Sequence, residues 1–255
     1  MKNKVESLIK EYVKHYCETR AVQTRWKEPL IAYADATDEM FSNLKNVVSS
    51  SHALPRDLLP EAKTVVAYFI PFEDAVAESN IVGKESSEVW ARAYVETNTL
   101  ILDLNVFIKS ELEKLGYNAV ITAATHNFDT KRLISDWSHR HVAFITGLGK
   151  VGLNNMLITD KGCCGRIGTF ITDLKLEPTK REDGENCLYK HLGTCTKCVN
   201  NCVNDALKVD SFDRHKCYEM CLHNDSLHPG IGLCDVCGKC LVGVPCSRVN
   251  PLKIK

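Results

Sequence analysis

Cysteine is the residue type whose number and spacing point most directly to chemistry in this chain. There are 13 cysteines in 255 residues, and all of them except Cys17 lie between Cys163 and Cys246. Such density is typical of disulfides in small secreted domains. The start of the chain, however, is charged throughout and lacks the apolar stretch of a secretory signal. We therefore expect a cytoplasmic protein whose reduced thiols bind metal.

The most specific motif is Cys195-x2-Cys198-x3-Cys202. It matches the last three positions of the bacterial ferredoxin run C-x2-C-x2-C-x3-C, which holds 4Fe–4S clusters. The first position of that run would be residue 192, which is Leu192 here. Cys187 lies a few residues upstream, so we expect it to supply the missing ligand through a longer loop.

A second cysteine group runs from Cys234 to Cys246, and Cys217 and Cys221 lie between the two groups. In two-cluster ferredoxins the cysteine after the longer gap reaches the other cluster. The spacing therefore predicts two interleaved 4Fe–4S clusters. The expected ligands are Cys187, Cys195, Cys198 and Cys246 for one cluster, and Cys202, Cys217, Cys237 and Cys240 for the other. Cys221 and Cys234 are either spare or replace one of these.

Structural zinc is the main alternative, because four-cysteine zinc sites also use C-x2-C pairs. Two features favour iron–sulfur clusters over zinc. The x3 step to Cys202 is a ferredoxin feature, and the two groups can interleave as a two-cluster fold requires. The adjacent Cys163 and Cys164 are either a reactive pair or, as we favour, residues packed in a turn.

The part of the chain before the cysteines has the pattern of an α/β or α+β domain. Helical periodicity appears at the N-terminus, over 37–48, 88–115 and about 130–146, and β-branched stretches predict strands at 64–70, 119–122, 156–159 and 166–176. A polar segment at 177–184 separates this part from the cysteines. The expected domains are therefore 1–180, which would hold a cofactor or substrate, and 181–255, a small ferredoxin-like domain.

Charge and hydropathy exclude some classes of partner. Lys+Arg and Asp+Glu each number 32, so the net charge is zero and nucleic-acid binding is not indicated, although tRNA is not excluded. The longest apolar stretch, 65–72, contains a proline and falls far short of the roughly 20 residues that cross a membrane. We expect no membrane association.

The segment from Gly147 to Gly152 fits the pattern G-x-G-x-x-G. A dinucleotide-binding loop needs a strand before it and a helix after it. Here a predicted helix precedes the loop and a predicted strand follows it, so we reject a Rossmann site. The simplest interpretation is a tight turn in which glycine permits positive φ.

The order of these motifs resembles the epoxyqueuosine reductase family. The matching segments are WSHRHVAFITGLGKVGLNN at 137–155, LIT at 157–159, RIGTFITD at 166–173 and LPEAKTVVAYFIPF at 59–72, followed by the cysteine region. The resemblance implies an N-terminal domain distantly like flavin nitroreductases, a C-terminal double-cluster module, and cobalamin bound without a protein ligand on cobalt. Two departures are Lys150, where the family has Trp, and Leu133, near which the family's proton-donating Asp would align.

The resemblance also suggests where substrate and cofactor meet. We expect Gly147, Gly149, Gly152 and Asn154 to approach a flat, amide-rimmed cofactor, with Asp136, His139 and His141 as proton sources. These polar residues could equally be a solvated helix face.

The expected activity is an iron–sulfur oxidoreductase, in which a low-potential donor such as ferredoxin or flavodoxin supplies electrons for reducing a small or nucleoside-like substrate. The departures favour a shorter paralogue with another substrate. The alternatives are an electron-transfer protein without a catalytic site and a flavin-dependent reductase.

Overall fold

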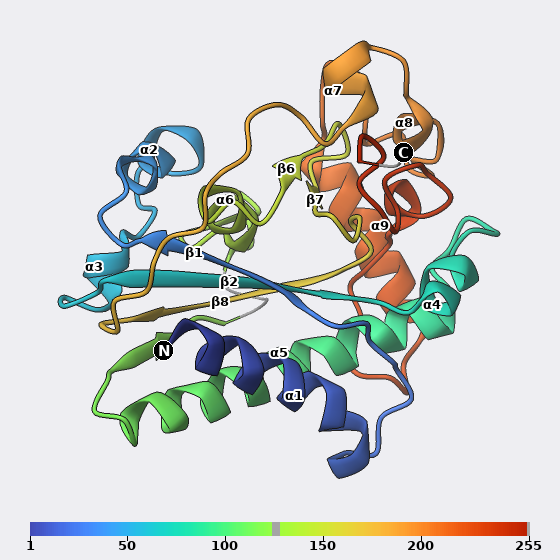
Figure 1. Cartoon of the computed structure of the whole chain (residues 1–255). Helices are drawn as coiled ribbons and strands as arrows, with labels where there is room; N and C mark the ends of the chain where they lie inside the picture. Colours follow the sequence, from blue (N-terminus) through green and yellow to red (C-terminus); the bar gives the residue numbers. More distant parts are fainter. Residues whose placement is uncertain (124–127, 254–255) are drawn as a thin grey trace.

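The computed structural model of the chain describes residues 1–123 and 128–253 and has a mixed α/β architecture. Its centre is a four-stranded sheet in the order β1-β2-β8-β3 (Figure 1), formed by Leu30–Asp35, Thr64–Pro71, Gly165–Thr172 and Ala119–Ile121. All neighbouring strands in this sheet are antiparallel. A Rossmann fold is built on a parallel sheet, so the rejection of that fold is confirmed.

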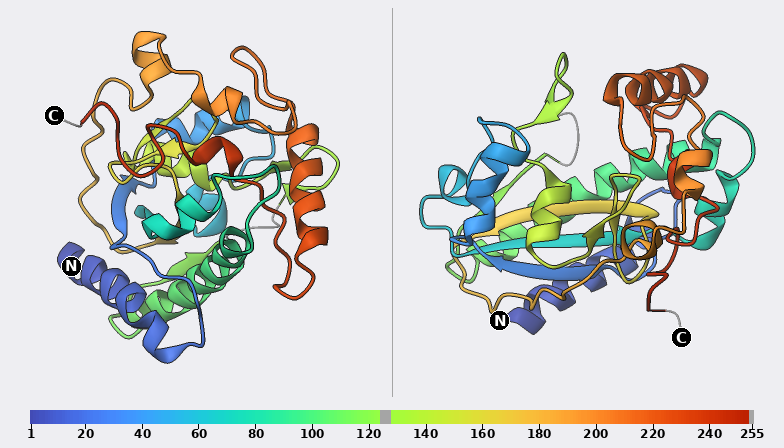
Figure 2. Two further views of the ribbon diagram at one scale, coloured as in Figure 1. Left: turned by 90° about the vertical axis from the view of Figure 1, so that its right-hand side faces the viewer. Right: turned by 90° about the horizontal axis from the view of Figure 1, so that it is seen from above.

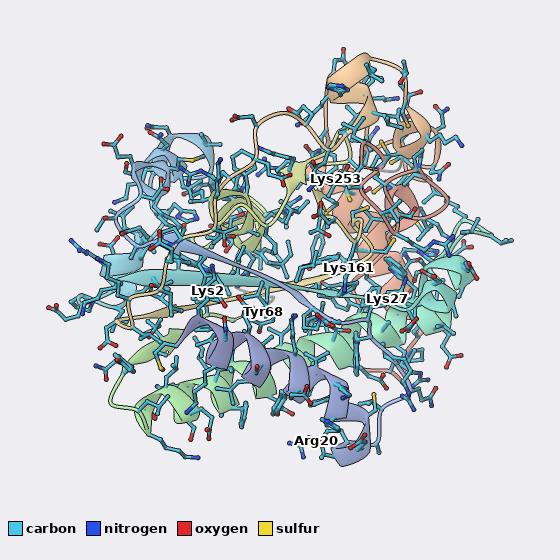
Figure 3. The ribbon with its side chains drawn as sticks, viewed as in Figure 1. Lys2, Arg20, Lys27, Tyr68, Lys161 and Lys253 are labelled. Atoms are coloured by element: carbon cyan, nitrogen blue, oxygen red, sulfur yellow. The ribbon has the colours of Figure 1, made fainter. Side chains whose placement is uncertain are left out.

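Strand β2 is buried along its whole length because helices cover both faces of the sheet. Successive side chains of a strand point to opposite faces. Val66, Tyr68 and Ile70 pack against helices α1 (Lys2–Thr19) and α5 (Glu88–Glu113). Figure 3 shows Tyr68 between the sheet and this helical layer, where its hydroxyl donates to Asn105 Oδ1 at 2.9 Å. The continuous apolar run of the sequence thus reflects a strand without a solvent face.

The opposite face of the sheet carries shorter elements. Helix α6 (His139–Ile145) packs on β2 and β8, with α2 (Glu39–Val47) and α3 (Pro55–Leu58) beside it. The glycine loop follows α6 and leads into the hairpin of β6 (Lys150–Val151) and β7 (Leu157–Ile158). A second hairpin, β4 (Phe128–Asp129) and β5 (Ile134–Ser135), precedes α6.

The cysteine-rich segment gathers at one end of the sheet (Figure 2). It contains α7 (Leu188–Leu192), α8 (Lys197–Asn200), α9 (Arg214–Leu227) and the 3-10 helix η1 (Lys239–Leu241). It contacts the first part of the chain closely, beside α4 (Asp74–Ser79) and α5. Asn80 Nδ2 donates to the Cys237 carbonyl at 2.9 Å, and Tyr94 donates to Asp235 Oδ1 at 2.8 Å. The cysteine-rich segment is therefore hydrogen-bonded directly to the first part of the chain.

The element predictions hold best where the pattern is long. The N-terminal helix, α2, α5, β2, β3, β7 and β8 lie where expected. The predicted helix over 130–146 is wrong in its first half, because α6 begins only at His139 and a hairpin occupies the preceding residues. Strand β1 was not predicted. Among residues 1–123 and 128–253, no helix has the length and apolarity needed to cross a bilayer.

Candidate functional site

Four cysteines, three from 187–198 and one from near the end of the chain, line one small cavity of about 20 Å3, which we call the first cysteine cavity. They are Cys187, Cys195, Cys198 and Cys246, the set that the spacing assigned to one cluster. Cys187 is the N-cap of α7 and Cys198 lies in α8. The rest of the lining is apolar apart from Asn154: Leu153, Ile158, Leu188, Val244, Pro245 and Pro251. Burial, reinforced by the neighbouring cysteines, raises the pKa of Cys198 to about 11.

The second predicted set lines a larger cavity of about 280 Å3, the second cysteine cavity. Its cysteines are Cys202, Cys217, Cys237 and Cys240, together with Cys221. Cys217 and Cys221 are four residues apart on α9, so both face the same side of the helix. Burial raises the pKa of Cys237 to about 11, whereas a hydrogen bond from Cys221 and the nearby charge of Arg140 bring the pKa of Cys217 to about 7.

An unpaired donor in the second cysteine cavity provides a test of whether an anionic cluster fits there. Trp90 lines the cavity and is only 2% exposed, yet its indole Nε1 has no hydrogen-bond partner in the described part of the chain. A buried N–H without an acceptor is costly. The sulfur atoms of a cluster are acceptors, so a 4Fe–4S cluster is compatible with this lining.

Of the remaining cysteines, Cys221 lines the second cavity. Cys234 is fully buried beside Ala91 and Tyr94 and lines neither cavity. Cys163 and Cys164 are buried in the turn before β8, and both thiols face the Leu241 carbonyl. Within the described residues, no three His, Cys, Asp or Glu side chains form a group suited to a single metal ion.

Arg140 lines a third cavity of about 420 Å3, which we call the arginine cavity. Its charge acts on Cys217 and Cys240, and its guanidinium donates to the Asn155 carbonyl. The arginine cavity is lined by Val47, Val48, Phe128, Leu133, Ile134, Ser135, Ser138, Arg140, His141, Val151, Asn155, Phe212 and Arg214. Its volume is within the usual range for small-molecule sites.

The three predicted proton sources lie in different environments. His141 lines the arginine cavity and pairs through Nδ1 with the Ser138 hydroxyl at 2.7 Å. His139 uses both ring nitrogens on Thr169 and the Ala123 carbonyl, which ties α6 to β8. Asp136 is exposed and accepts a hydrogen bond from Ser51. Burial lowers the pKa of both histidines to about 4, so both are neutral at pH 7.

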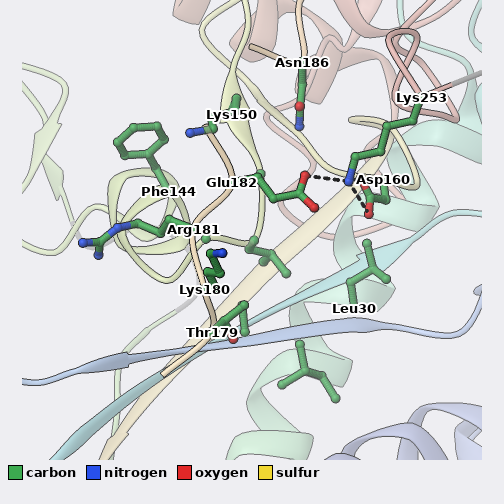
Figure 4. A pocket seen from close by; sticks show the side chains of 15 residues that line it. Leu30, Phe144, Lys150, Asp160, Thr179, Lys180, Arg181, Glu182, Asn186 and Lys253 are labelled. Atoms are coloured by element: carbon green, nitrogen blue, oxygen red, sulfur yellow. Dashed lines mark hydrogen bonds and ion pairs between the residues drawn. The ribbon is translucent and has the colours of Figure 1, made fainter. Parts of the chain in front are cut away.

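The glycine loop lines a separate cavity of about 220 Å3 (Figure 4). Gly147 and Gly149 contribute to it beside Lys150, Lys180 and Arg181, while Lys253 pairs there with Asp160 and Glu182 at 2.9 and 2.7 Å. A side chain at Gly149 would come 2.5 Å from the Ile158 carbonyl oxygen. The close backbone approach here is therefore to strand β7 of the same chain.

The other two predicted cofactor residues do not line that cavity. Gly152 packs against Asn154 and Ile158, and Asn154 lines the first cysteine cavity. The predicted glycines therefore do not share a wall with the predicted proton sources, although Val151 of the same loop lines the arginine cavity together with His141.

Two residues around the second cysteine cavity were not predicted from the sequence. Arg166, the second residue of strand β8, stacks its guanidinium 4.4 Å from the centre of the Tyr94 ring. Lys239 is only 3% exposed and donates to the carbonyls of Asn80 and Val82. The sequence contains only a weak signal for these two residues. Lys239 lies between two cysteines, and Arg166 lies near the start of a predicted strand.

A basic groove adjoins the arginine cavity and shares Ile134, Phe212 and Arg214 with it. Its cationic side chains come from the β4–β5 turn and from the segment before and within α9: Lys131, Arg132, Lys208, Arg214 and Lys216. Asp205 and Asp213 also line it. Its charge is therefore locally positive although the whole chain is neutral.

Comparison with known proteins confirms the predicted resemblance. The chain is 28% identical over 202 residues to an epoxyqueuosine reductase of Synechocystis sp., a match that covers 71% of this chain and 63% of that protein. The chain thus spans less than two thirds of its relative's length. No protein-family model matches it.

Solved structures show the same fold. The structure of epoxyqueuosine reductase from Streptococcus thermophilus superposes with a TM-score of 0.55 at 16% identity, over 97% of this chain and 69% of that one. The Bacillus subtilis enzyme gives a TM-score of 0.53 at 18% identity, over 95% and 66%. A further epoxyqueuosine reductase, solved with an epoxyqueuosine-modified tRNA stem loop, gives 0.50 at 17% identity, over 95% and 64%.

Proposed function

We propose that this chain is an iron–sulfur reductase of the epoxyqueuosine reductase type, with two 4Fe–4S clusters. One observation carries the proposal. Two sets of four cysteines, chosen from their spacing in the sequence, line two separate cavities. Each cavity contains the four thiols that one cubane cluster requires. The Synechocystis relative, a named reductase, supports a redox role.

The arginine cavity is our proposed site of reduction. Arg140 lines it, and the charge of Arg140 acts on Cys217 and Cys240 of the second cysteine cavity, so the two sites are neighbours through this residue. Ser138, His141 and Asn155 offer the polar groups that would hold the amide rim of a corrinoid. When bound, a corrinoid supplies a low-potential centre that reduces the substrate.

His141 is the best candidate for moving a proton in this cavity. Leu133 lines the cavity at the position where the family's proton-donating Asp would align, and no carboxylate is found among the described lining residues. His141 is neutral at pH 7, and its Nε2 has no partner in the described part of the chain. With the ring hydrogen on Nδ1, that nitrogen carries a lone pair and can accept a proton beside the substrate.

The basic groove suggests the class of substrate. Its cationic side chains suit a phosphate backbone, and it opens beside the arginine cavity. A structurally similar epoxyqueuosine reductase was solved with a modified tRNA stem loop. We propose a nucleoside substrate carried on RNA, with ferredoxin or flavodoxin as the one-electron donor.

Anaerobic purification followed by iron, sulfide, zinc and cobalt analysis tests the clusters. We expect about eight irons per chain, as two 4Fe–4S clusters require. Stoichiometric zinc with little iron would contradict the proposal. If cobalamin binds to the protein, the visible spectrum of the added cobalamin should change. Iron without any bound organic cofactor would favour an electron-transfer protein, and bound flavin would favour a flavin reductase.

Turnover of an epoxyqueuosine-containing stem loop under reducing conditions tests the reaction site. His141→Gln should lower kcat by about 10² to 10⁴, the usual contribution of general acid–base catalysis, and leave the iron content unchanged. His15→Gln, on the exposed surface of α1, is the matched control. Equal rates for both variants would exclude His141 from proton transfer.

A further inference from the structure

The two cysteine cavities differ in the charge around them. The described residues that line the first cavity include no charged side chain apart from the cysteines themselves. The second cavity is lined by Arg166 and Lys239, with Asp235 as its carboxylate, and the charge of Arg140 also acts on its cysteines. Positive groups therefore outnumber negative ones around the second cavity only.

This difference acts on the reduction potential of a cluster. Each one-electron reduction adds a negative charge to a cluster that is already anionic. Nearby cations stabilise the added charge, whereas an apolar lining does not. Arg166 and Lys239 should therefore make a cluster in the second cavity easier to reduce than one in the first.

Hydrogen bonds to the sulfur atoms of a cluster also raise its reduction potential. The backbone N–H of Leu207 donates to Cys202 Sγ at 3.3 Å. Trp90 adds the unpaired indole N–H described above, held in place by Phe72, whose ring meets the indole edge-to-face at 5.3 Å. An acceptor on a cluster would satisfy this donor and stabilise the reduced state.

We infer that the second cysteine cavity holds the higher-potential cluster, so that electrons run from the first cavity to the second and leave towards the arginine cavity. This inference rests on the proposed function. A reduced cluster held by Cys187, Cys195, Cys198 and Cys246 would give one electron to a cluster held by the cysteines of the second cavity. That second cluster would pass the electron to the acceptor bound in the arginine cavity. A reduced ferredoxin or flavodoxin then reduces the first cluster again.

Potentiometric titration of the reconstituted full chain, followed by electron paramagnetic resonance, tests the order of the two potentials. Cys198→Ser and Cys237→Ser identify which signal belongs to which cavity. Arg166→Gln and Trp90→Phe should each lower the potential of the second-cavity cluster. We expect about a tenfold change in its reduction equilibrium, which is about 59 mV for one electron. Lys190→Gln, exposed on α7 beside the first cavity, should shift neither potential.

Asp235→Asn separates an electrostatic effect from general damage. It removes a negative charge from the second cavity but keeps an oxygen acceptor for Tyr94. Asp235→Asn should raise the reduction potential of the second-cavity cluster, whereas Arg166→Gln should lower it. Equal potentials for the two clusters, a higher potential in the first cavity, or shifts of the same sign in both variants would overturn the inference. Fewer than about eight irons in the wild-type chain would instead contradict the proposed function.

Discussion

Gly238 lies directly against the indole ring of Trp90. A Cβ atom built on Gly238 would come 2.3 Å from Cζ2 of that ring, and the φ angle of Gly238 is +73°. The residue precedes η1 and follows Cys237, so this contact fixes the second cysteine group against helix α5. Only glycine satisfies both the backbone conformation and the packing.

Gly238→Ala should therefore destabilise the protein by about 2–4 kcal/mol, through positive-φ strain together with overpacking against Trp90. Thermal unfolding of the reconstituted protein measures the loss. Gly193→Ala is the control, because Gly193 has a φ of +71° but a Cβ atom added there would meet nothing within 4 Å. It should cost only the strain, about 1 kcal/mol. Equal losses for both variants would argue against the Trp90 contact.

Single cysteine substitutions should separate ligands from spare thiols. Cys198→Ser and Cys237→Ser should each lower the iron content from about eight to about four per chain, because each removes one ligand from one cluster. Cys234→Ala should keep all the iron, since Cys234 lies outside both cavities. Iron and sulfide analysis after identical anaerobic reconstitution gives the answer. Loss of half of the iron from Cys234→Ala would require a new ligand assignment.

Iron removal should loosen the cysteine-rich segment before the sheet. Helix α7 buries no side chain and α9 buries only Met220 and Asn224, so cluster ligation should supply much of the folding energy there. We expect hydrogen exchange and proteolytic cleavage to increase after about residue 185, while α1, α5 and β2 stay protected. The test compares holoprotein with chelator-treated protein under anaerobic conditions. Uniform protection of both parts without iron would contradict it.

Acid should destabilise the fold partly through His139. Burial lowers its pKa to about 4, against about 6.5 in an unfolded chain. The unfolded state therefore binds the proton more readily. The stability contributed by the neutral ring is complete above pH 6.5 and is lost as the pH falls towards 4.

His139→Gln cannot take up that proton. Its free energy of unfolding in urea should fall less between pH 7 and pH 4.5 than that of the wild type, by roughly 2 kcal/mol. His15→Gln, on the exposed surface of α1, should follow the wild type. An identical pH dependence for all three proteins would mean that His139 is not held neutral.

The two longest apolar patterns in the sequence predicted their elements correctly. Helix α5 has apolar residues at helical spacing over many turns, and β2 is a continuous apolar run, so both were found. Strand β1 pairs with residues 29 to 39 positions away, and local sequence does not reveal such pairing. The helix expected over 130–146 was too long because apolar residues of the β4–β5 hairpin happened to continue its periodicity.

The cysteine spacing by itself predicted two sets of four thiols, with Cys221 and Cys234 left open, because interleaved clusters favour short spacings between their ligands. Only the tertiary structure decided what surrounds each set. Trp90 from α5, Arg166 from β8 and Lys239 from η1 meet at the second cavity, although they are distant in the chain. No local pattern specifies such a meeting, since packing between elements determines it. The glycine loop, predicted to approach a cofactor, likewise lies against β7 because the hairpin folds back on it.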